Sequence, residues 1–206
     1  MAGRRPQPPG IRRVEIAGGI ASGKSTLARL LSSVGLNPVY EQFKKNPFFE
    51  AFYRDPSGTA FEAEITFLLQ HYHLQRQAMQ AARPFCADFS VVLDHSYAQV
   101  TLTPSDLRLF RGIQQRVEES LSPRTLLVVL VCPPRMQLQR IRRRRRSAES
   151  GISLKYLEKV DWSLKKNVAA LPKSHRVLTI DSVALDFAHN ARDVKHVLDV
   201  VKSAIA

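Results

Sequence analysis

Short apolar runs alternate along this chain with longer stretches in which apolar residues recur every three or four positions. The short runs are typical of buried strands, and the longer periodic stretches are typical of helices. The runs predict five strands, at Val14 to Ala17, Pro38 to Glu41, Ser90 to Asp94, Thr125 to Val131 and Arg176 to Ile180. The periodic stretches predict helices at Lys24 to Val34, Pro47 to Tyr53, Thr59 to Ala82, Pro104 to Leu121, Pro134 to Arg146, Ser153 to Leu171 and Ala191 to Ile205.

Helices rather than tight turns separate the predicted strands, which indicates an α/β fold with a parallel sheet covered on both faces. The 206 residues, 44% of them hydrophobic, suit one globular domain. We expect this domain over residues 13–206, after a disordered basic segment at 1–12. That segment lacks the apolar stretch of a secretion signal, and a transit remnant is its less favoured interpretation. No apolar run reaches the ~20 residues of a membrane span, so we expect a cytoplasmic protein without a membrane partner.

The chain is strongly basic, with 31 Lys and Arg against 18 Asp and Glu and a formal net charge of +13. This charge predicts attraction either to nucleic acid or to phosphorylated small molecules. Six arginines fall within the seven residues 140–146. Alone, such a run is typical of a nucleic-acid-binding tract. Here it continues a predicted helix and precedes another, which favours an arginine-rich lid over a phosphate site. Nucleic acid stays open as the less favoured partner.

The residues GGIASGKST, at 18–26, follow the first predicted strand and open a helix. In a loop with this glycine and lysine spacing, backbone N–H groups hold phosphates, Lys24 reaches the terminal phosphates and Ser25 can bind Mg²⁺. The alternative is a glycine turn that begins an ordinary helix. The spacing does not distinguish a kinase from an ATPase or a GTPase. We assign nucleotide binding to Gly18, Gly19, Ile20, Ala21, Ser22, Gly23, Lys24, Ser25 and Thr26.

Two acids close predicted strands, Glu41 the second and Asp94 the third. Ligands of open parallel sheets bind beyond the carboxyl ends of the strands. A phosphate loop, a metal and a carboxylate that takes a proton from an alcohol are the parts needed for phosphoryl transfer. Either acid could instead cap a helix or form a turn.

Five segments together carry a resemblance to a known family: GGIASGKST, YEQFKKNPFFEAFYRDP, VVLDHS, RIRRRRRSAESGISLKYLEKV and VLTIDSVALDF. The chain resembles the deoxynucleoside kinases over residues 14–206, and is most similar to the bacterial deoxyguanosine/deoxyadenosine-type members. The resemblance implies a P-loop kinase fold with a five-stranded parallel sheet flanked by helices. It also implies ATP and Mg²⁺ as cofactors, phosphorylation of a nucleoside 5′-hydroxyl, and a homodimer.

The resemblance further implies roles for individual residues. Glu41 is similar to the family's general base for the 5′-hydroxyl, and Tyr53 with Glu149 to the pair that binds the sugar 3′-hydroxyl. Asp94 matches the first residue of an acid-Arg-Ser signature that assists at the 5′-oxygen or the metal. Phosphate contacts are implied for the catalytic lysine and the lid arginines, namely Lys24, Arg140, Arg144 and Arg146.

Three departures from the family pattern bear on activity. The signature's arginine is His95 here, which would make a catalytic cation depend on pH near neutrality, unless the histidine is only structural. The base-reading glutamine is Glu64, at the edge of an inward stripe formed by Phe61, Ile65, Leu68 and Tyr72. An ionised glutamate only accepts hydrogen bonds, which favours a donor-rich base such as guanine, unless Glu64 is merely solvated.

The third departure is the stretch after Ser96, which lacks the aromatic residue that stacks on the base. These differences leave open a catalytically impaired nucleotide-binding protein of the same fold, or a basic protein that contacts RNA.

Overall fold

A single parallel sheet organises the computed structural model, which describes residues 11–81, 83–121 and 124–206. Its strand order is β2-β3-β1-β4-β5, and every neighbouring pair is parallel. The strands are β1 (Arg13–Ala17), β2 (Asn37–Val39), β3 (Phe85–Ala87), β4 (Thr125–Val131) and β5 (Arg176–Asp181). The predicted five-stranded parallel sheet is therefore confirmed. The predicted disordered segment lies, up to residue 10, outside the described residues.

Helices connect consecutive strands, as the periodicity predicted, although several ends differ from the predicted ones. The first helix, for example, ends at Leu31 and continues as a 3-10 turn. The α-helices are α1 (Lys24–Leu31), α2 (Phe49–Arg54), α3 (Pro56–Gln80), α4 (Val91–Thr101), α5 (Pro104–Ser120), α6 (Pro134–Arg144), α7 (Leu154–Ala169) and α8 (Ala191–Ile205). The 3-10 turns are η1 (Ser32–Val34), η2 (Phe43–Lys45) and η3 (Ser147–Glu149).

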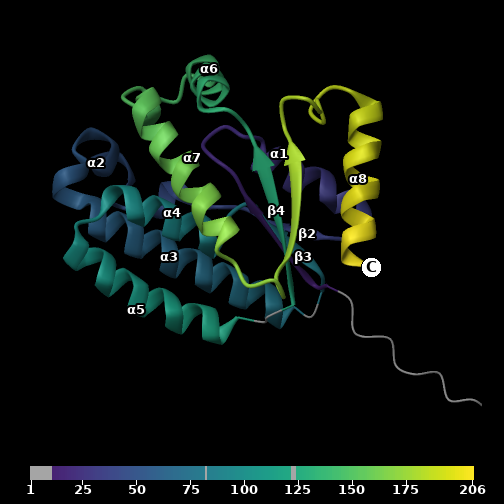
Figure 1. Ribbon diagram of the computed structural model, residues 1–206, viewed down its shortest axis with the longest axis horizontal. Coiled ribbons are helices and arrows are strands. Elements are labelled where there is room, and N and C mark those ends of the chain that lie inside the picture. The colour runs from purple at the N-terminus through teal and green to yellow at the C-terminus, as the bar shows by residue number, and fades with distance from the viewer. Residues whose placement is uncertain (1–10, 82, 122–123) are drawn as a thin grey trace, which may run out of the picture.

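Strand β4 shows why both faces of the sheet are covered. Leu126, Val128 and Leu130 pack in the cluster that contains side chains of α1 and α8. The alternate residues Leu127 and Val129 pack in a second cluster with side chains of α4 and α7. Figure 1 shows α8 on one side of the sheet and α3, α4, α5 and α7 on the other. A strand buried on both faces reads as a continuous apolar run, which is the pattern that predicted it.

The position predicted for the third strand was wrong. Residues 90–94 do not form a strand: β3 is Phe85–Ala87, and α4 begins at Val91. Ser90 caps this helix, because its hydroxyl accepts a hydrogen bond from the backbone N–H of Leu93 at 3.2 Å. A short apolar run such as Val-Val-Leu fits a strand or a helix equally well, and the serine at its start is a typical helix cap. Asp94 therefore lies in the first turn of α4.

The parallel strands bring their carboxyl ends to one edge of the sheet, and α6 lies at that edge (Figure 1). The phosphate loop follows β1 there, Glu41 follows β2, and Asp88 follows β3. Within the part of the chain that the structure describes, no helix combines the length and apolar character of a membrane span.

Candidate active site

The loop between β1 and α1 has the shape of a phosphate cradle. A Cβ atom on Gly18 would lie 2.6 Å from Ser22 Oγ and 3.0 Å from the Leu130 carbonyl oxygen. Gly23 has a φ of 107°, a left-handed conformation that residues with a side chain rarely adopt. Lys24 Nζ donates to the carbonyl oxygens of Gly18 at 2.9 Å and Gly19 at 3.1 Å. The ammonium group is therefore held over the loop.

Arg140 fixes the cradle from the side of α6. Its guanidinium donates to the Ala21 carbonyl oxygen at 3.3 Å and to that of Ser22 at 3.4 Å. It also donates to the Ser182 carbonyl oxygen at 2.8 Å, just beyond β5. One side chain thus joins the phosphate loop to the β5–α8 loop.

Asp88, which the sequence analysis did not single out, connects the loop to the second strand. Ser25 Oγ donates to Asp88 Oδ2 at 2.5 Å, and the backbone N–H of Glu41 donates to Asp88 Oδ1 at 2.6 Å. Burial raises the pKa of Asp88, and the two hydrogen bonds oppose that shift. Asp88 directly follows β3, and Asp88-Phe89-Ser90 repeats the acid-x-Ser pattern that was assigned to residues 94–96. The sequence contains this pattern, but the third strand was predicted to end at Asp94, so Asp88 was not assigned to it.

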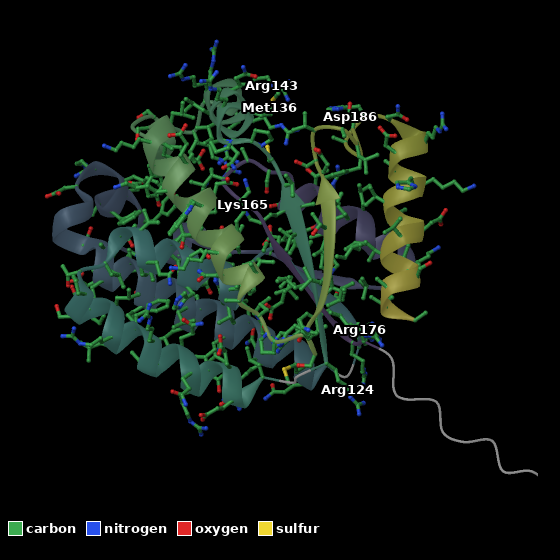
Figure 2. All side chains as sticks on the ribbon, viewed as in Figure 1. Arg124, Met136, Arg143, Lys165, Arg176 and Asp186 are labelled. Carbon is green, nitrogen blue, oxygen red and sulfur yellow. The ribbon has the colours of Figure 1, made fainter. Side chains whose placement is uncertain are left out.

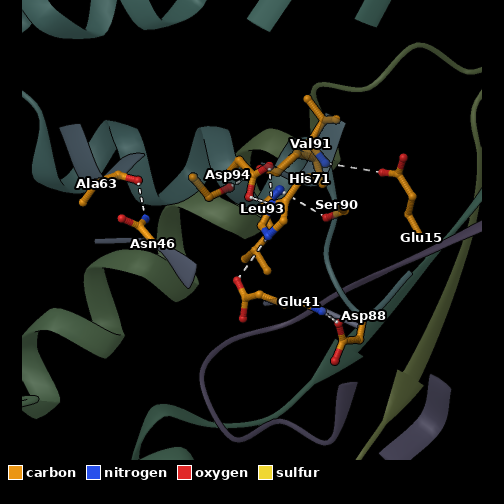
Figure 3. Close-up of polar contacts among 12 residues, drawn as sticks. Glu15, Glu41, Asn46, Ala63, His71, Asp88, Ser90, Val91, Leu93 and Asp94 are labelled. Carbon is orange, nitrogen blue, oxygen red and sulfur yellow. Dashed lines mark hydrogen bonds and ion pairs between the residues drawn. The ribbon is translucent and has the colours of Figure 1, made fainter. Parts of the chain in front are cut away.

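Glu41 lies beside His71 (Figure 3) and lines the same cavity as the phosphate loop. His71 Nε2 is 3.3 Å from Glu41 Oε1. Burial alone would raise the pKa of Glu41, but His71 and Lys24 outweigh it and lower the pKa below its usual value. The carboxylate is therefore ionised and faces the same cavity as Lys24, which is what a general base for an alcohol requires.

A cavity of about 870 Å³ runs from the phosphate loop toward α3 and α4. This volume is within the range typical of small-ligand sites. Figure 2 shows Met136 and Arg143 of α6 at the same end of the molecule as Asp186 in the β5–α8 loop, and all three line the cavity. Aromatic side chains form much of its inner wall, namely Phe43, Phe49, Phe52, Tyr53, Phe67, Phe89, Tyr97 and Tyr156. Tyr97 directly follows Ser96, so that stretch does supply an aromatic residue.

Tyr53 and Glu64 lie on the inner wall of this cavity. Burial, with Glu149 and Glu41 nearby, raises the pKa of Tyr53. Glu64 is only 5% exposed, so it is not merely solvated. Thr101 Oγ1 donates to Glu64 Oε1 at 2.9 Å. Burial raises the pKa of Glu64 to about 8, with the Thr101 hydrogen bond opposing the shift.

The arginines after residue 139 divide into two groups. Arg140, Arg143, Arg144 and Arg146 line the cavity, whereas Arg142 and Arg145 do not. Arg144 forks onto the buried Glu149, with Nε donating to Oε2 at 2.7 Å and Nη2 to Oε1 at 2.5 Å. Arg146 lies 5.0 Å from the centre of the Phe43 ring, measured from its guanidinium carbon. The helix ends at Arg144, two residues earlier than predicted.

The structure contradicts the predicted position of His95. This histidine does not line the cavity. Its Nδ1 is 2.5 Å from Gln114 Oε1 on α5, and its Nε2 is 2.8 Å from Gln99 Nε2 one turn along α4. Burial lowers the pKa of His95, which opposes a cationic role. Because residues 90–94 are not a strand, the acid-x-Ser sequence at 94–96 lies within α4, where Asp94 lines the cavity and His95 does not.

Most of the predicted site residues share the cavity. Those that line it are Ile20, Ala21, Ser22, Gly23, Lys24, Ser25, Thr26, Glu41, Tyr53, Glu64, Asp94, Arg140, Arg144, Arg146 and Glu149. Gly18 and Gly19 contribute the carbonyl groups that bind Lys24. Both oxygens of Asp94 face His71 Nδ1, at 2.9 and 3.0 Å, so this carboxylate is occupied by the histidine.

A parallel sheet with a phosphate cradle and a carboxylate at its carboxyl edge defines a P-loop phosphotransferase. The deoxynucleoside kinase family model matches residues 14–206, and the chain belongs to that family. It is therefore a nucleoside kinase.

Two kinds of relatives agree with this assignment. The chain is 27% identical over 201 residues to a deoxyguanosine kinase of Bacillus subtilis (strain 168), covering 93% of this chain and 97% of the relative. It is 29% identical over 151 residues to a deoxyadenosine kinase of Dictyostelium discoideum, covering 70% and 62%. A solved deoxyadenosine kinase from M. mycoides superimposes with a TM-score of 0.80 at 21% identity, over 93% of this chain and 99% of that chain. That likeness supports the fold.

Proposed function

We propose that this kinase transfers the γ-phosphoryl group of ATP to the 5′-hydroxyl of a deoxynucleoside, with Glu41 as the general base. The observation that carries this proposal is the position of Glu41: an ionised carboxylate shares one cavity with the Lys24 ammonium. The 5′-hydroxyl oxygen forms the new bond to phosphorus as the bond to the ADP oxygen breaks, and the hydroxyl proton goes to Glu41. Such catalysis depends mainly on positioning and electrostatic stabilisation.

The residues present fit a nucleoside triphosphate with Mg²⁺. The Gly18 cradle has no room for a side chain, and Ser25 with Asp88 offers the oxygen ligands that Mg²⁺ prefers. Among the described residues, no group of three or more His, Cys, Asp or Glu side chains could hold a metal ion. Mg²⁺ needs no such group, because substrate phosphates and waters complete its shell. When bound, it neutralises charge on the phosphate oxygens.

We assign the metal-side carboxylate to Asp88 in place of Asp94, since Asp88 is the acid that contacts Ser25. Lys24, Arg144 and Arg146 are the cations of the cavity that we expect to bind phosphate oxygens. The fork between Arg144 and Glu149 lies at its rim and supports a lid role for this segment.

We further propose a purine acceptor with adjacent N–H donors on its base, as in guanine. Glu64 supports this choice, because it lines the cavity and its carboxyl oxygens can accept further hydrogen bonds beside the one from Thr101. Burial raises the pKa of Glu64 to about 8, and the N–H donors of a bound base would favour its ionised form, because an ionised glutamate only accepts hydrogen bonds. Tyr53 and Glu149 stay our candidates for the sugar 3′-hydroxyl, because both line the cavity. The homodimer stays a prediction, for sedimentation to test.

Glu41→Gln tests the catalytic proposal, with radiolabelled ATP and a panel of deoxynucleosides. We expect turnover to fall by about 10²- to 10⁴-fold, the usual contribution of a general base. ATP affinity, measured by calorimetry without acceptor, should stay within a factor of about 3, because Gln keeps the shape of the side chain. Glu50→Gln, at an exposed position of α2, is the matched control. Full turnover by the Glu41 variant would remove Glu41 from this role.

A further inference from the structure

His71, on α3, is a buried histidine whose two ring nitrogens both face carboxylates. It is 2% exposed. Nδ1 lies 2.9 and 3.0 Å from the two oxygens of Asp94 on α4, and Nε2 lies 3.3 Å from Glu41 Oε1 after β2 (Figure 3). The Nε2 contact is an ion-pair distance without the alignment of a hydrogen bond. The ring stacks on Phe89, with centroids 4.0 Å apart and planes at 10°.

This arrangement selects the doubly protonated ring. A neutral imidazole has one N–H, so its other nitrogen would turn a lone pair toward a carboxylate oxygen. The imidazolium has an N–H on each nitrogen, so Nδ1 donates to Asp94 and the Nε2 side turns positive charge toward Glu41. Burial disfavours the charge, but Asp94 and Glu41 outweigh burial and raise the pKa of His71 to about 10.

The surrounding charges support the same state. Glu64 lies two turns before His71 on the same buried side of α3, and where it is ionised its charge also favours the cation. Lys24 and Arg146 are the cations that also act on Glu41. In a phosphate loop the lysine binds phosphate oxygens, and we have assigned Arg146 the same task. His71 is the cation on the other side of Glu41, and Asp94 holds it there.

We propose that His71 is a positioning residue: an imidazolium, oriented by Asp94 and stacked on Phe89, that holds the Glu41 carboxylate in the cavity in its ionised form. The role of Glu41 that this inference serves rests on the proposed function. His71 lies outside the sequence motifs described above. The inference also assigns a role to the buried Asp94, which orients His71. The inference also assigns to His71, on α3, the cationic role that was predicted for His95, on α4.

The pH dependence of kcat/KM tests the effect on Glu41, with His71→Gln as the variant. An opposite charge within a few ångströms typically lowers the pKa of a carboxyl group by about 1 to 3 units. Without it, we expect the acid limb of the profile to move upward by about 1 to 3 pH units. The loss should appear in kcat, with the KM for ATP unchanged. His71→Arg keeps a planar cation and should restore the limb, and His73→Gln, exposed on the same helix, is the control.

An acid limb of His71→Gln that coincides with the wild-type limb overturns the proposal. Wild-type protein without activity on any nucleoside would instead refute the proposed function. A spectroscopic measurement is independent of turnover and of variant folding. Long-range ¹H–¹⁵N NMR of the wild-type protein at about pH 8, above the ordinary histidine pKa, should show both His71 nitrogens with N–H-type shifts. A pyridine-type shift on either nitrogen overturns the proposal as well.

Discussion

Glu64→Gln should change how the stability of this protein depends on pH. Glu64 is 5% exposed, and its pKa is raised to about 8 from an ordinary 4.5. Between these values the folded chain holds a proton on Glu64 that the unfolded chain has lost. Because the folded state binds more protons, its stability falls as pH rises, by up to about 1.4 kcal/mol per unit. Gln keeps the shape and cannot ionise.

The expected result is a gap between variant and wild type that grows with pH. From about pH 5.5 to about pH 7.5 the free energy of unfolding of Glu64→Gln should gain about 1–3 kcal/mol relative to wild type. The lower value allows for the coupling of Glu64 to Asp94, Glu41 and His71. Urea unfolding followed by circular dichroism at each pH measures the gap. Glu62→Gln, exposed on the same helix, is the control. A gap that stays constant across this range would refute the reasoning.

Two further substitutions test the metal side and the rim of the cavity. Asp88→Asn removes the charge beside Ser25 and should lower kcat/KM by about 10²-fold or more. A higher Mg²⁺ concentration should recover part of this loss. A full rate for the variant at low Mg²⁺ would contradict the assignment of Asp88. Arg144→Lys keeps the positive charge but loses the two parallel hydrogen bonds to Glu149, so kcat should fall by about 10-fold or more. Steady-state kinetics would measure this loss, and circular dichroism would show that the fold persists. An unchanged kcat would exclude a catalytic role for these two hydrogen bonds.

The parts of the site that the sequence predicted are those encoded locally. The phosphate loop needs its glycines and lysine at fixed spacing, because the backbone of one turn forms the cradle. Strand β4 is a nearly continuous apolar run, because both of its faces are buried. In each case a few consecutive residues determine the structure, so the sequence alone was enough.

The third strand was predicted at the wrong place because its sequence signal is short. β3 has three residues, Phe85–Ala87, and of these only Phe85 is of a type enriched in strands. The neighbouring Val91-Val92-Leu93 is more apolar, but Ser90 makes it the start of a helix. This shift of a few residues placed the predicted acid of the acid-x-Ser signature at Asp94, whereas we propose Asp88 for that role.

His71 was missed because it depends on tertiary packing. The apolar residues Phe61, Ile65, Leu68 and Tyr72 predicted the inward face of α3. In the structure the fully buried side of this helix also carries Glu64, His71 and Gln75, at intervals of seven and four residues. Ile65 and Tyr72 pack toward the cluster with α5, while Glu64 and His71 line the cavity. Polar residues at helical spacing on a long amphipathic helix were the available signal.

The distribution of charge explains why the net charge of +13 says little about the acceptor. Acidic side chains are over-represented in the cavity: Glu41, Glu64, Asp88, Asp94, Glu149 and Asp186 line it. The Lys and Arg residues there are Lys24, Arg140, Arg143, Arg144 and Arg146, so the positive excess of the chain lies elsewhere. A cavity with balanced charge suits a neutral nucleoside held by specific hydrogen bonds, whereas a polyanion would need an uncompensated basic surface. We therefore expect the site to bind its acceptor through hydrogen bonds to individual side chains, with Glu41 and Glu64 as our candidates, rather than through bulk attraction.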